Sequence, residues 1–403
     1  MSTPSARMLF FFLLTASCIA AAPSALAKPS EAVKKYREQM FDPPMRMLAN
    51  RTLAEMFHTA RVKAADEPSR LETNIVPLDF TYEFQGERRK ADEVVESTAT
   101  DALLIIKNGR VVHEGYYNQS TELTRFNSYS AAKSVNAIMV GLALKDGKIG
   151  ALTDAVTKYA PELSGTGYDG TTIRDLLEMR SGIAWVENFF TPGNLSYDAH
   201  VSSWVQERAR YTDTARLTRH EHEPGTFFRY NSMDAAVVGL VIARATGMPV
   251  SRYLSERLWQ KAGMEADAFY VIDGPPGVGQ EFTAGGFNAV LRDYGRLGLL
   301  MLDHGRANGE QFFPEDYVSS LSSSVTADAD PNFGYGYFWW TVKGTEAFTA
   351  VGGEGQFIYV DPPSQTVIVK LSHGPVGPEA VPVVAETLAF FRAASAWNGA
   401  VGE

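Results

Sequence analysis

Strand-like patterns lie near both ends of this chain, and helical patterns lie between them. Residues 102–107 form an apolar run, Asn108-Gly109 offers a two-residue turn, and residues 110–117 continue the strand pattern. This arrangement is a strong signature of a β-hairpin. Short strand patterns return late in the sequence, at residues 334–342, 356–360 and 366–371. Strands at both ends predict one α/β domain that combines the two ends of the chain around a helical insertion.

Apolar side chains recur at helical spacing between these strands. Residues 130–145 place apolar side chains at i, i+3, i+4 and i+7, as expected for a helix with one buried stripe. Residues 233–246 are apolar almost all round, which predicts a buried helix that ends at Gly247. Further helical patterns occur around residues 173–177, 290–301 and 379–394.

These patterns predict four parts of the chain. They are a signal peptide (residues 1–27), an N-terminal extension that wraps the domain (28–98), an α/β domain (99–149 and 283–403) and a mostly helical insertion domain (150–282). The extension is polar and only weakly periodic, so its sequence does not indicate a role.

The first 27 residues have the pattern of a secretory signal peptide. Arg7 gives a positive start, residues 8–19 are apolar, and Ala25-Leu26-Ala27 is a small-x-small cleavage site. The apolar run is too short to span a bilayer, so an uncleaved anchor is the weaker alternative. A lipoprotein acylated at Cys18 ranks second, because the residues before it fit a lipobox poorly. We expect cleavage after Ala27 and a periplasmic or secreted protein that is not held in a membrane.

Cys18 is the only cysteine, so removal of the leader would leave none. Such a chain cannot contain a disulfide, a thiolate metal site or an iron–sulfur cluster. The net charge of -10 argues against nucleic acid and anionic lipid surfaces, because both require a basic face. We expect a small-molecule substrate, while the oligomeric state stays open.

The sharpest chemical candidate is Ser130-Ala131-Ala132-Lys133, at the predicted start of a helix. Positions i and i+3 share a helix face, so the lysine amine can approach the serine hydroxyl. A serine becomes a good nucleophile when a nearby base removes its proton, and a buried lysine with a lowered pKa can do so. Taken alone, the spacing is better explained by a helix-capping serine and a solvated lysine.

Two later segments support the catalytic interpretation. Tyr230-Asn231-Ser232 precedes the buried helix, where Tyr230 can be a second proton carrier or a packing residue, and Asn231 or Ser232 a helix cap. Residues 350–356 contain glycines that let a strand approach a substrate closely. An N–H from this strand, with that of Ser130, can form an oxyanion hole, although a simple bulged turn fits the same residues.

These three motifs, in this order, resemble those of the serine β-lactamase and penicillin-binding-protein superfamily. The resemblance covers about residues 100–372, and it is closest to 6-aminohexanoate-dimer hydrolases and family VIII carboxylesterases. Residues 159–163, 168–170 and 367–372 look particularly like the nylon-oligomer hydrolases. The resemblance implies a β-lactamase/DD-peptidase-like α/β (α+β) fold, in which helices flank an antiparallel sheet, and an acyl-enzyme mechanism.

The third motif departs from the superfamily pattern. Ala350-Val351-Gly352 stands where β-lactamases and peptidases carry Lys-Ser/Thr-Gly or a triplet that begins with His. The cation that would hold a substrate carboxylate is missing, so substrates with a carboxylate there should be disfavoured. By the same alignment, Gly353 would supply the oxyanion N–H of the strand.

Departures from the nylon-dimer hydrolases imply a more apolar substrate pocket. Phe189 and Ala284 stand where nylon-dimer hydrolases carry a tyrosine and an asparagine, so two hydrogen-bonding groups are lost. The predicted substrate-binding residues are Trp185, Phe189, Phe190, Ser232, Trp339 and Glu354. An aromatic residue is more often part of a core than of a pocket, so the core is the alternative place for each aromatic residue of this set.

Other patterns carry no chemistry. His220-Glu221-His222-Glu223 lacks the i, i+4 histidine spacing of helical zinc sites, and neither a phosphate loop nor a Gly-x-Ser-x-Gly elbow occurs. We therefore predict no metal or organic cofactor.

The resulting hypothesis is an exported serine hydrolase that cleaves ester or linear amide bonds. Ser130 would be the nucleophile, Lys133 and Tyr230 the proton carriers, and the N–H groups of Ser130 and Gly353 the oxyanion donors. A D-alanyl-D-alanine carboxypeptidase or class C-like β-lactamase is the main alternative, which export would suit but Ala350 argues against. A non-catalytic binding module is the third, and the intact catalytic set argues against it.

Overall fold

The computed structural model describes residues 28–323, 325–326 and 330–399. The predicted signal peptide, with Cys18, lies outside the described residues. Among the residues that are described, no single helix is long and apolar enough to cross a membrane. One pair of helices bent by 72° passes that test together, by length and composition only.

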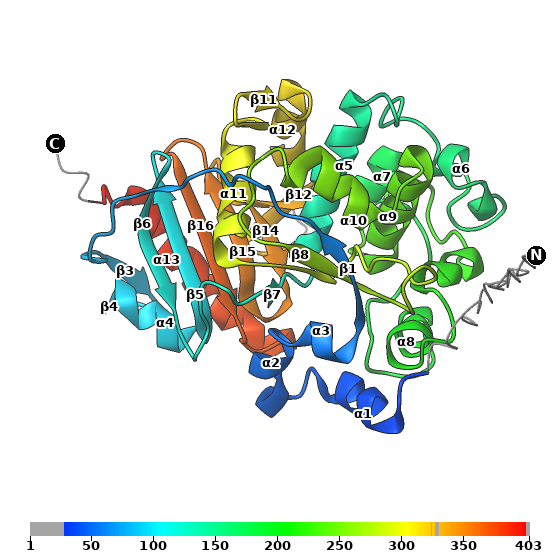
Figure 1. Cartoon of the computed structure of the whole chain (residues 1–403), viewed down its shortest axis with the longest axis horizontal. Helices are drawn as coiled ribbons and strands as arrows, with labels where there is room; N and C mark the ends of the chain where they lie inside the picture. The colour runs from blue at the N-terminus through cyan, green and yellow to red at the C-terminus, as the bar shows by residue number, and fades with distance from the viewer. Residues whose placement is uncertain (1–27, 324, 327–329, 400–403) are drawn as a thin grey trace, which may run out of the picture.

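A sheet of eight strands forms the centre of the molecule, in the order β12-β13-β14-β15-β16-β5-β6-β2 (Figure 1). Its strands are β12 Phe333–Gly336, β13 Trp339–Val342, β14 Phe348–Gly352, β15 Gln356–Asp361, β16 Thr366–Ser372, β5 Thr100–Lys107, β6 Arg110–Tyr116 and β2 Glu72–Thr73. All neighbouring pairs are antiparallel except β2 and β6. Since β16 pairs with β5, with Thr366 opposite Lys107, the sheet joins both ends of the chain as predicted.

The predicted hairpin is confirmed. Asn108 and Gly109 both have positive φ, 50° and 75°, as the two-residue turns that match strand twist require. The aromatic run at 334–342 was predicted as one strand, and this is wrong. Tyr337 and Phe338 have φ of 21° and 62° and turn the chain between β12 and β13. Aromatic residues are poor turn formers, so the sequence did not indicate this turn.

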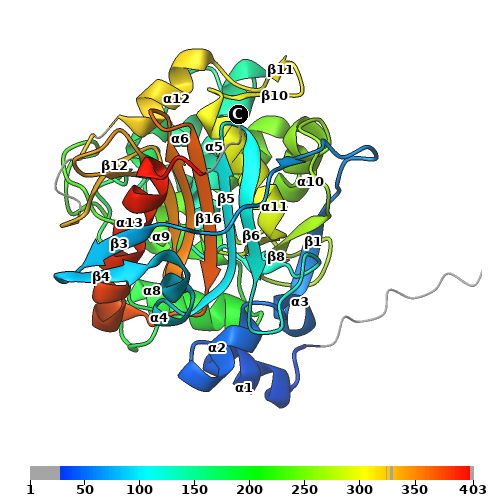
Figure 2. The same cartoon turned by 90° about the vertical axis from the view of Figure 1, so that its left-hand side faces the viewer.

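Helices cover both faces of the sheet. Leu104 and Ile106 of β5 belong to the apolar cluster that includes α5 (Ala131–Lys145) and α11 (Leu291–Leu302). Leu103 and Ile105 point the other way, into a second cluster with α13 (Ala380–Ala396). Figure 2 shows α13 and α11 on opposite sides of the sheet. Burial on both faces explains why β5 is apolar along most of its length.

The remaining helices lie mostly beside the sheet, around α5 (Figure 1). They are α6 Val156–Tyr159, α7 Ile173–Leu177, α8 Leu195–His200, α9 Ser232–Thr246, α10 Val250–Leu254 and α12 Glu315–Ser322, with the short helical turns η2 Pro161–Leu163, η3 Val201–Val205, η4 Tyr211–Leu217, η5 Ser255–Trp259, η6 Gly353–Gly355 and η7 Gly377–Glu379. The Asn231 side chain accepts from two N–H groups at the start of α9, and Gly247, with φ of 69°, ends it. The helix is buried along most of its length, as its sequence predicts.

Residues 28–98 contact several distant parts of the molecule. They contain α1 Glu31–Gln39, α2 Pro43–Ala49, α3 Leu53–Met56, β1 His58–Val62, β2, β3 Thr81–Phe84, β4 Glu87–Lys90, η1 Ala91–Glu93 and α4 Val94–Ser97. Strand β1 enters a second sheet, β1-β8-β9-β7, built with β8 Ala268–Ile272, β9 Phe287–Ala289 and β7 Phe126–Asn127. A short hairpin is formed by β10 Arg306–Ala307 and β11 Glu310–Gln311. The predicted domain boundaries remain a prediction.

Candidate active site

Ser130 and Lys133 form a buried pair at the start of α5. The Lys133 amine donates to Ser130 Oγ at 2.8 Å and to the Ala284 carbonyl oxygen at 2.8 Å. Its side chain is 1% exposed, and the Ser130 side chain makes no capping hydrogen bond. Burial lowers the pKa of Lys133 to about 8, although the charge of Glu187 opposes the shift. Lys133 is therefore not solvated, and Ser130 is not a helix cap. The lysine amine is placed to act as a base on the serine hydroxyl.

A glycine lets strand β14 lie against the turn that presents Ser130. A Cβ at Gly352 would stand 2.1 Å from the Ser128 carbonyl oxygen and 3.2 Å from the Ala131 nitrogen. No side chain fits there, because backbone atoms cannot yield as a flexible side chain can. This close approach brings the next residue, Gly353, to the cavity that Ser130 also lines.

Tyr230 lies beside the same pair. Its ring centroid is 5.0 Å from the Lys133 amine nitrogen, and its ring stacks on Trp340 at 5.7 Å. Burial raises the pKa of Tyr230 above its ordinary value, and a hydrogen bond with Ser130 acts in the opposite direction. At neutral pH the phenol therefore keeps its proton, which makes it a donor in the resting site.

Glu187 also lies in this site, and sequence reasoning missed it. Its Oε2 accepts from Trp185 Nε1 at 2.6 Å and from the Ser232 N–H at 3.0 Å, and Oε1 accepts from the Ser232 hydroxyl. The carboxylate lines the cavity. An isolated glutamate in a loop carries no sequence signal. Only the fold brings it to the Tyr-x-Ser motif.

Glu187→Gln is expected to shift the acid limb of the pH–rate profile to lower pH. The Glu187 charge raises the pKa of Lys133, so its removal lets the amine lose its proton at lower pH. Glutamine can keep the contacts with Trp185 and Ser232, because it offers one acceptor and one donor. The measurement is kcat/KM against pH, with the Tm as a control for folding. An acid limb that stays in place or moves to higher pH would contradict the assignment.

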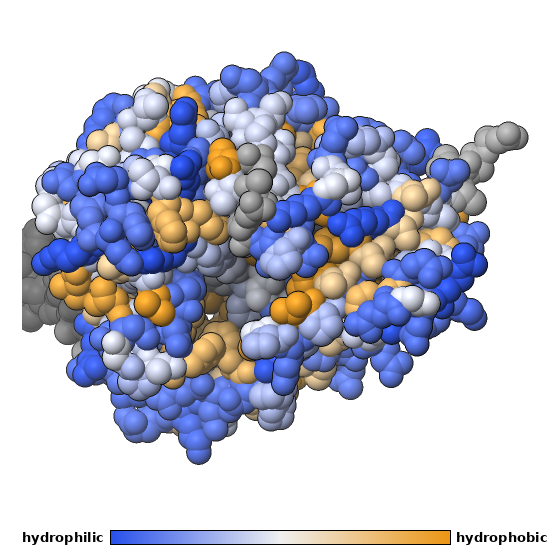
Figure 3. Space-filling model, turned by 180° about the vertical axis from the view of Figure 1, so that it is seen from behind, coloured by the Kyte–Doolittle hydropathy of each residue, from blue (hydrophilic) through white to orange (hydrophobic). Residues whose placement is uncertain are grey.

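The cavity over Ser130 is largely apolar. Its described lining includes Met40, Phe41, Leu53, Phe57, Phe189, Phe190, His200, Trp204, Val271, Phe282 and Val376. Four of these come from residues 28–98, which the sequence did not connect with the site. No lysine or arginine is among the described lining residues, and burial lowers the pKa of His200 to about 4, so this imidazole is neutral at pH 7. On the face shown in Figure 3, apolar side chains gather beside a recess in a mostly hydrophilic surface.

Five of the six predicted substrate-binding residues fall into three groups. Phe189, Phe190 and Ser232 line the cavity. Trp339 does not: it is fully buried and packs edge-on against Phe348 in the core, so its assignment as a wall is corrected. Trp185 is also buried and does not line the cavity. It donates a hydrogen bond to Glu187, which does.

Glu354 is the remaining predicted substrate-binding residue. It reaches the cavity, but its two carboxylate oxygens are bonded to Asn50 and Tyr129. Its polar contacts are therefore with the protein itself.

The described residues offer no metal site. No group of three or more His, Cys, Asp or Glu side chains is placed to hold an ion in that part of the chain.

Comparisons with known proteins identify the family of this chain. The chain is 29% identical to a 6-aminohexanoate-dimer hydrolase of Paenarthrobacter ureafaciens over 337 residues, which cover 80% of this chain and 84% of that protein. A solved structure of a candidate 6-aminohexanoate-dimer hydrolase from Bacillus anthracis has a TM-score of 0.80 at 24% identity, covering 91% of this chain and 98% of that one. EstCE1, a hydrolase with promiscuous acyltransferase activity, has a TM-score of 0.60 at 16% identity, covering 74% and 98%. The β-lactamase family model matches residues 88–390. The chain therefore belongs to the β-lactamase family and has the fold of its serine hydrolases.

Proposed function

We propose that this protein, exported after removal of its leader, hydrolyses ester or linear amide bonds through an acyl-enzyme on Ser130. The contact that carries the proposal is the 2.8 Å hydrogen bond between the buried Lys133 amine and Ser130 Oγ, with the Tyr230 ring beside it. The relative from Paenarthrobacter ureafaciens is named for hydrolysis of an amide dimer, which supports the same chemistry here.

The first half of the cycle forms the acyl-enzyme. The free amine of Lys133 takes the Ser130 proton as Oγ attacks the substrate carbonyl carbon. The carbonyl oxygen becomes an oxyanion, which the N–H groups of Ser130 and Gly353 stabilise. Tyr230 then gives its proton to the leaving oxygen or nitrogen as that bond breaks, and it recovers a proton from the Lys133 ammonium.

The second half removes the acyl group. A water molecule gives one proton to the Lys133–Tyr230 pair as its oxygen attacks the acyl carbon. The Ser130 oxygen leaves and takes that proton back, so Lys133 ends as the free amine. Each proton that leaves a side chain is therefore returned within the cycle, which uses only side chains of this protein and one water molecule.

The cavity indicates the class of acyl group. Its walls are apolar, and Glu187 and Glu354 are the carboxyl groups among its described lining. Ala350, buried in β14, offers no charge where related enzymes place a cation. A substrate carboxylate would be desolvated there without a partner, which is costly. We therefore propose neutral, apolar acyl groups.

A matched pair of substrates tests this proposal. The p-nitrophenyl monoester of adipic acid and its methyl ester differ by one carboxylate, and we expect kcat/KM to be about 100-fold higher for the neutral ester. A panel of p-nitrophenyl esters of increasing chain length, the 6-aminohexanoate dimer, a cephalosporin and a D-Ala-D-Ala peptide extends the comparison. Measurable acylation of Ser130 by micromolar penicillin would instead support the peptidase or β-lactamase alternative.

A further inference from the structure

Two strained backbone positions flank the proposed oxyanion donors. Tyr129 precedes Ser130 and has φ of 44°, and Glu354 follows Gly353 and has φ of 61°. Non-glycine residues adopt this left-handed region only at an energetic cost, so other contacts must hold them there. The Tyr129 hydroxyl lies 3.0 Å from Glu354 Oε1. One side-chain contact thus joins the two turns that carry the donors.

Asn50 connects the same two side chains from the N-terminal extension. Its Nδ2 donates to Glu354 Oε2 at 2.7 Å and to the Ser372 carbonyl oxygen at 3.2 Å, and its Oδ1 accepts from the Tyr129 hydroxyl at 2.5 Å. A carbonyl oxygen can only accept, so the contact with Ser372 fixes which side of the carboxamide carries the NH2 group. Asn50 and Glu354 are 2% and 3% exposed. Both side chains are therefore largely shielded from bulk water.

A count of protons indicates the state of Glu354. The Tyr129 hydroxyl has one proton and faces two acceptors, Asn50 Oδ1 and Glu354 Oε1. The shorter contact, to Asn50, uses that proton. The contact with Glu354 is then satisfied when Oε1 carries a proton and donates to the phenol oxygen. With that proton each of the three side chains donates once and accepts once around a closed ring.

The surroundings of Glu354 agree with this count. Burial raises its pKa to about 7, although Asn50 and Tyr129 and the charges of Arg46 and His373 act in the opposite direction. The His373 ring also contacts another carboxylate, because its Nδ1 lies 3.0 Å from both oxygens of Asp101. Desolvation is thus the dominant influence on this carboxyl group.

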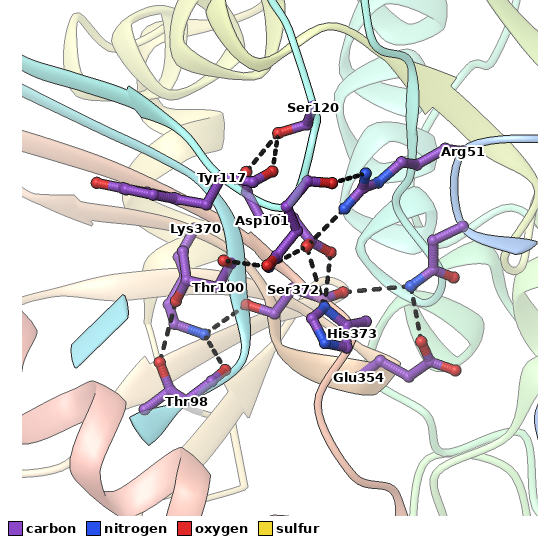
Figure 4. A network of polar contacts seen from close by, with 12 residues as sticks. Arg51, Thr98, Thr100, Asp101, Tyr117, Ser120, Glu354, Lys370, Ser372 and His373 are labelled. Carbon is purple, nitrogen blue, oxygen red and sulfur yellow. Dashed lines mark hydrogen bonds and ion pairs between the residues drawn. The ribbon is translucent and has the colours of Figure 1, made fainter. Parts of the chain in front are cut away.

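Arg51, next to Asn50 in the chain, anchors this part of the extension. Its Nη2 lies 2.6 Å from Asp101 Oδ1, in a largely buried ion pair. Figure 4 shows this pair beside His373, Ser372 and Glu354, with the buried Lys370 bonded to Ser372 on the far side. The extension is thus fixed to strands β5 and β16 at the point where Asn50 reaches the ring.

We infer that Asn50, Tyr129 and a protonated Glu354 form a ring of hydrogen bonds that positions the two oxyanion donors. This inference rests on the proposed function, and it assigns residues 28–98 a role in it: they supply Asn50 as a positioning residue. The ring members touch each other rather than the reacting atoms, so their loss should reduce kcat and leave KM nearly unchanged.

Activity of four variants tests the ring. Asn50→Ala and Glu354→Ala are expected to slow ester turnover and the labelling of Ser130 by a fluorophosphonate about 10- to 100-fold, because small misplacements of catalytic groups are costly. Glu354→Gln should stay within about threefold of the wild type, because glutamine reproduces both the donor and the acceptor of a protonated glutamate. The matched control is Glu386→Gln. Glu386 is also buried and accepts from a tyrosine of the extension, Tyr82, but it belongs to α13 and is not part of the ring.

A stability measurement separates failure of the ring from failure of the proposed function. A carboxyl group whose folded pKa is raised destabilises the folded state as the pH rises from its unfolded value toward about 7. The wild type should therefore lose more Tm between pH 5 and pH 8 than Glu354→Gln. Equal losses would overturn the protonated ring, and alanine variants labelled at the wild-type rate would overturn its positioning role. A wild type that is not labelled at all would overturn the proposed function, and the Tm comparison would still decide the ring.

Discussion

Ser130→Ala is expected to abolish turnover, with kcat/KM for a p-nitrophenyl ester reduced about 10,000-fold or more. The variant keeps the cavity and both oxyanion N–H groups but has no oxygen to form the acyl bond. The hydroxyl makes no capping hydrogen bond to α5, so its loss should leave the Tm almost unchanged. A fluorophosphonate should add one covalent group to the wild type and none to the variant, as intact-mass measurement would show.

Ser134→Ala is the matched control for this experiment. Ser134 lies one turn further along the same helix, and its buried hydroxyl donates to the Phe338 carbonyl oxygen at 2.7 Å. Its removal should cost about 1 kcal/mol of stability and leave the labelling intact. Equal labelling of Ser130→Ala and the wild type would show that Ser130 is not the nucleophile, and it would exclude an acyl-enzyme on Ser130.

The parts of the fold that were predictable are those encoded by local chemistry. Asn108-Gly109 can adopt the positive φ angles that a two-residue hairpin needs, and Asn231 and Gly247 mark the ends of α9 as a cap and a left-handed stop. The turn at Tyr337-Phe338 has no such local signal. It is held by its surroundings, since the Phe338 N–H donates to the Leu177 carbonyl oxygen at 2.8 Å and the Phe338 carbonyl oxygen accepts from the Ser134 hydroxyl.

The same distinction applies to the site. Ser130 and Lys133 are three residues apart on one helix, so their contact follows from helix geometry. Tyr230 was identified because a family resemblance supplied long-range information that spacing could not. Glu187 and Asn50 had neither advantage, because only tertiary structure brings them to Ser232 and Glu354.

The wall residues show the limit of composition as evidence. An aromatic side chain suits a pocket and a core equally, and Trp339 belongs to the core while Phe190, 62% exposed, lines the cavity. The extension was described only as polar, yet Met40, Phe41 and Leu53 form part of the cavity wall. The few apolar residues of a polar segment form too weak a pattern for the sequence to assign them to a distant site.

Lys133→Met is expected to reduce kcat/KM about 100- to 10,000-fold, because general-base assistance of a serine contributes about this much. Methionine keeps the unbranched shape of the buried stem and removes the amine that accepts the Ser130 proton. The Tm at pH 7 should be unchanged or higher, because the folded state no longer buries an amine whose charged form is disfavoured. Lys133→Arg is the matched control: it restores a positive charge but not a base, since arginine stays protonated, so it should remain inactive.

The pH dependence tests whether the free amine is the active form. With a pKa of about 8, roughly one-tenth of Lys133 is unprotonated at pH 7 and nine-tenths at pH 9, so kcat/KM should rise about tenfold over that range. Stability should also rise with pH between about 8 and 10.5, because the unfolded lysine holds a proton there that the folded one has lost. The profile is best measured in Glu354→Gln, where ionisation of the ring cannot offset the rise. A kcat/KM that falls from pH 7 to pH 9 in that variant would show that the ammonium form acts, and would exclude Lys133 as the base.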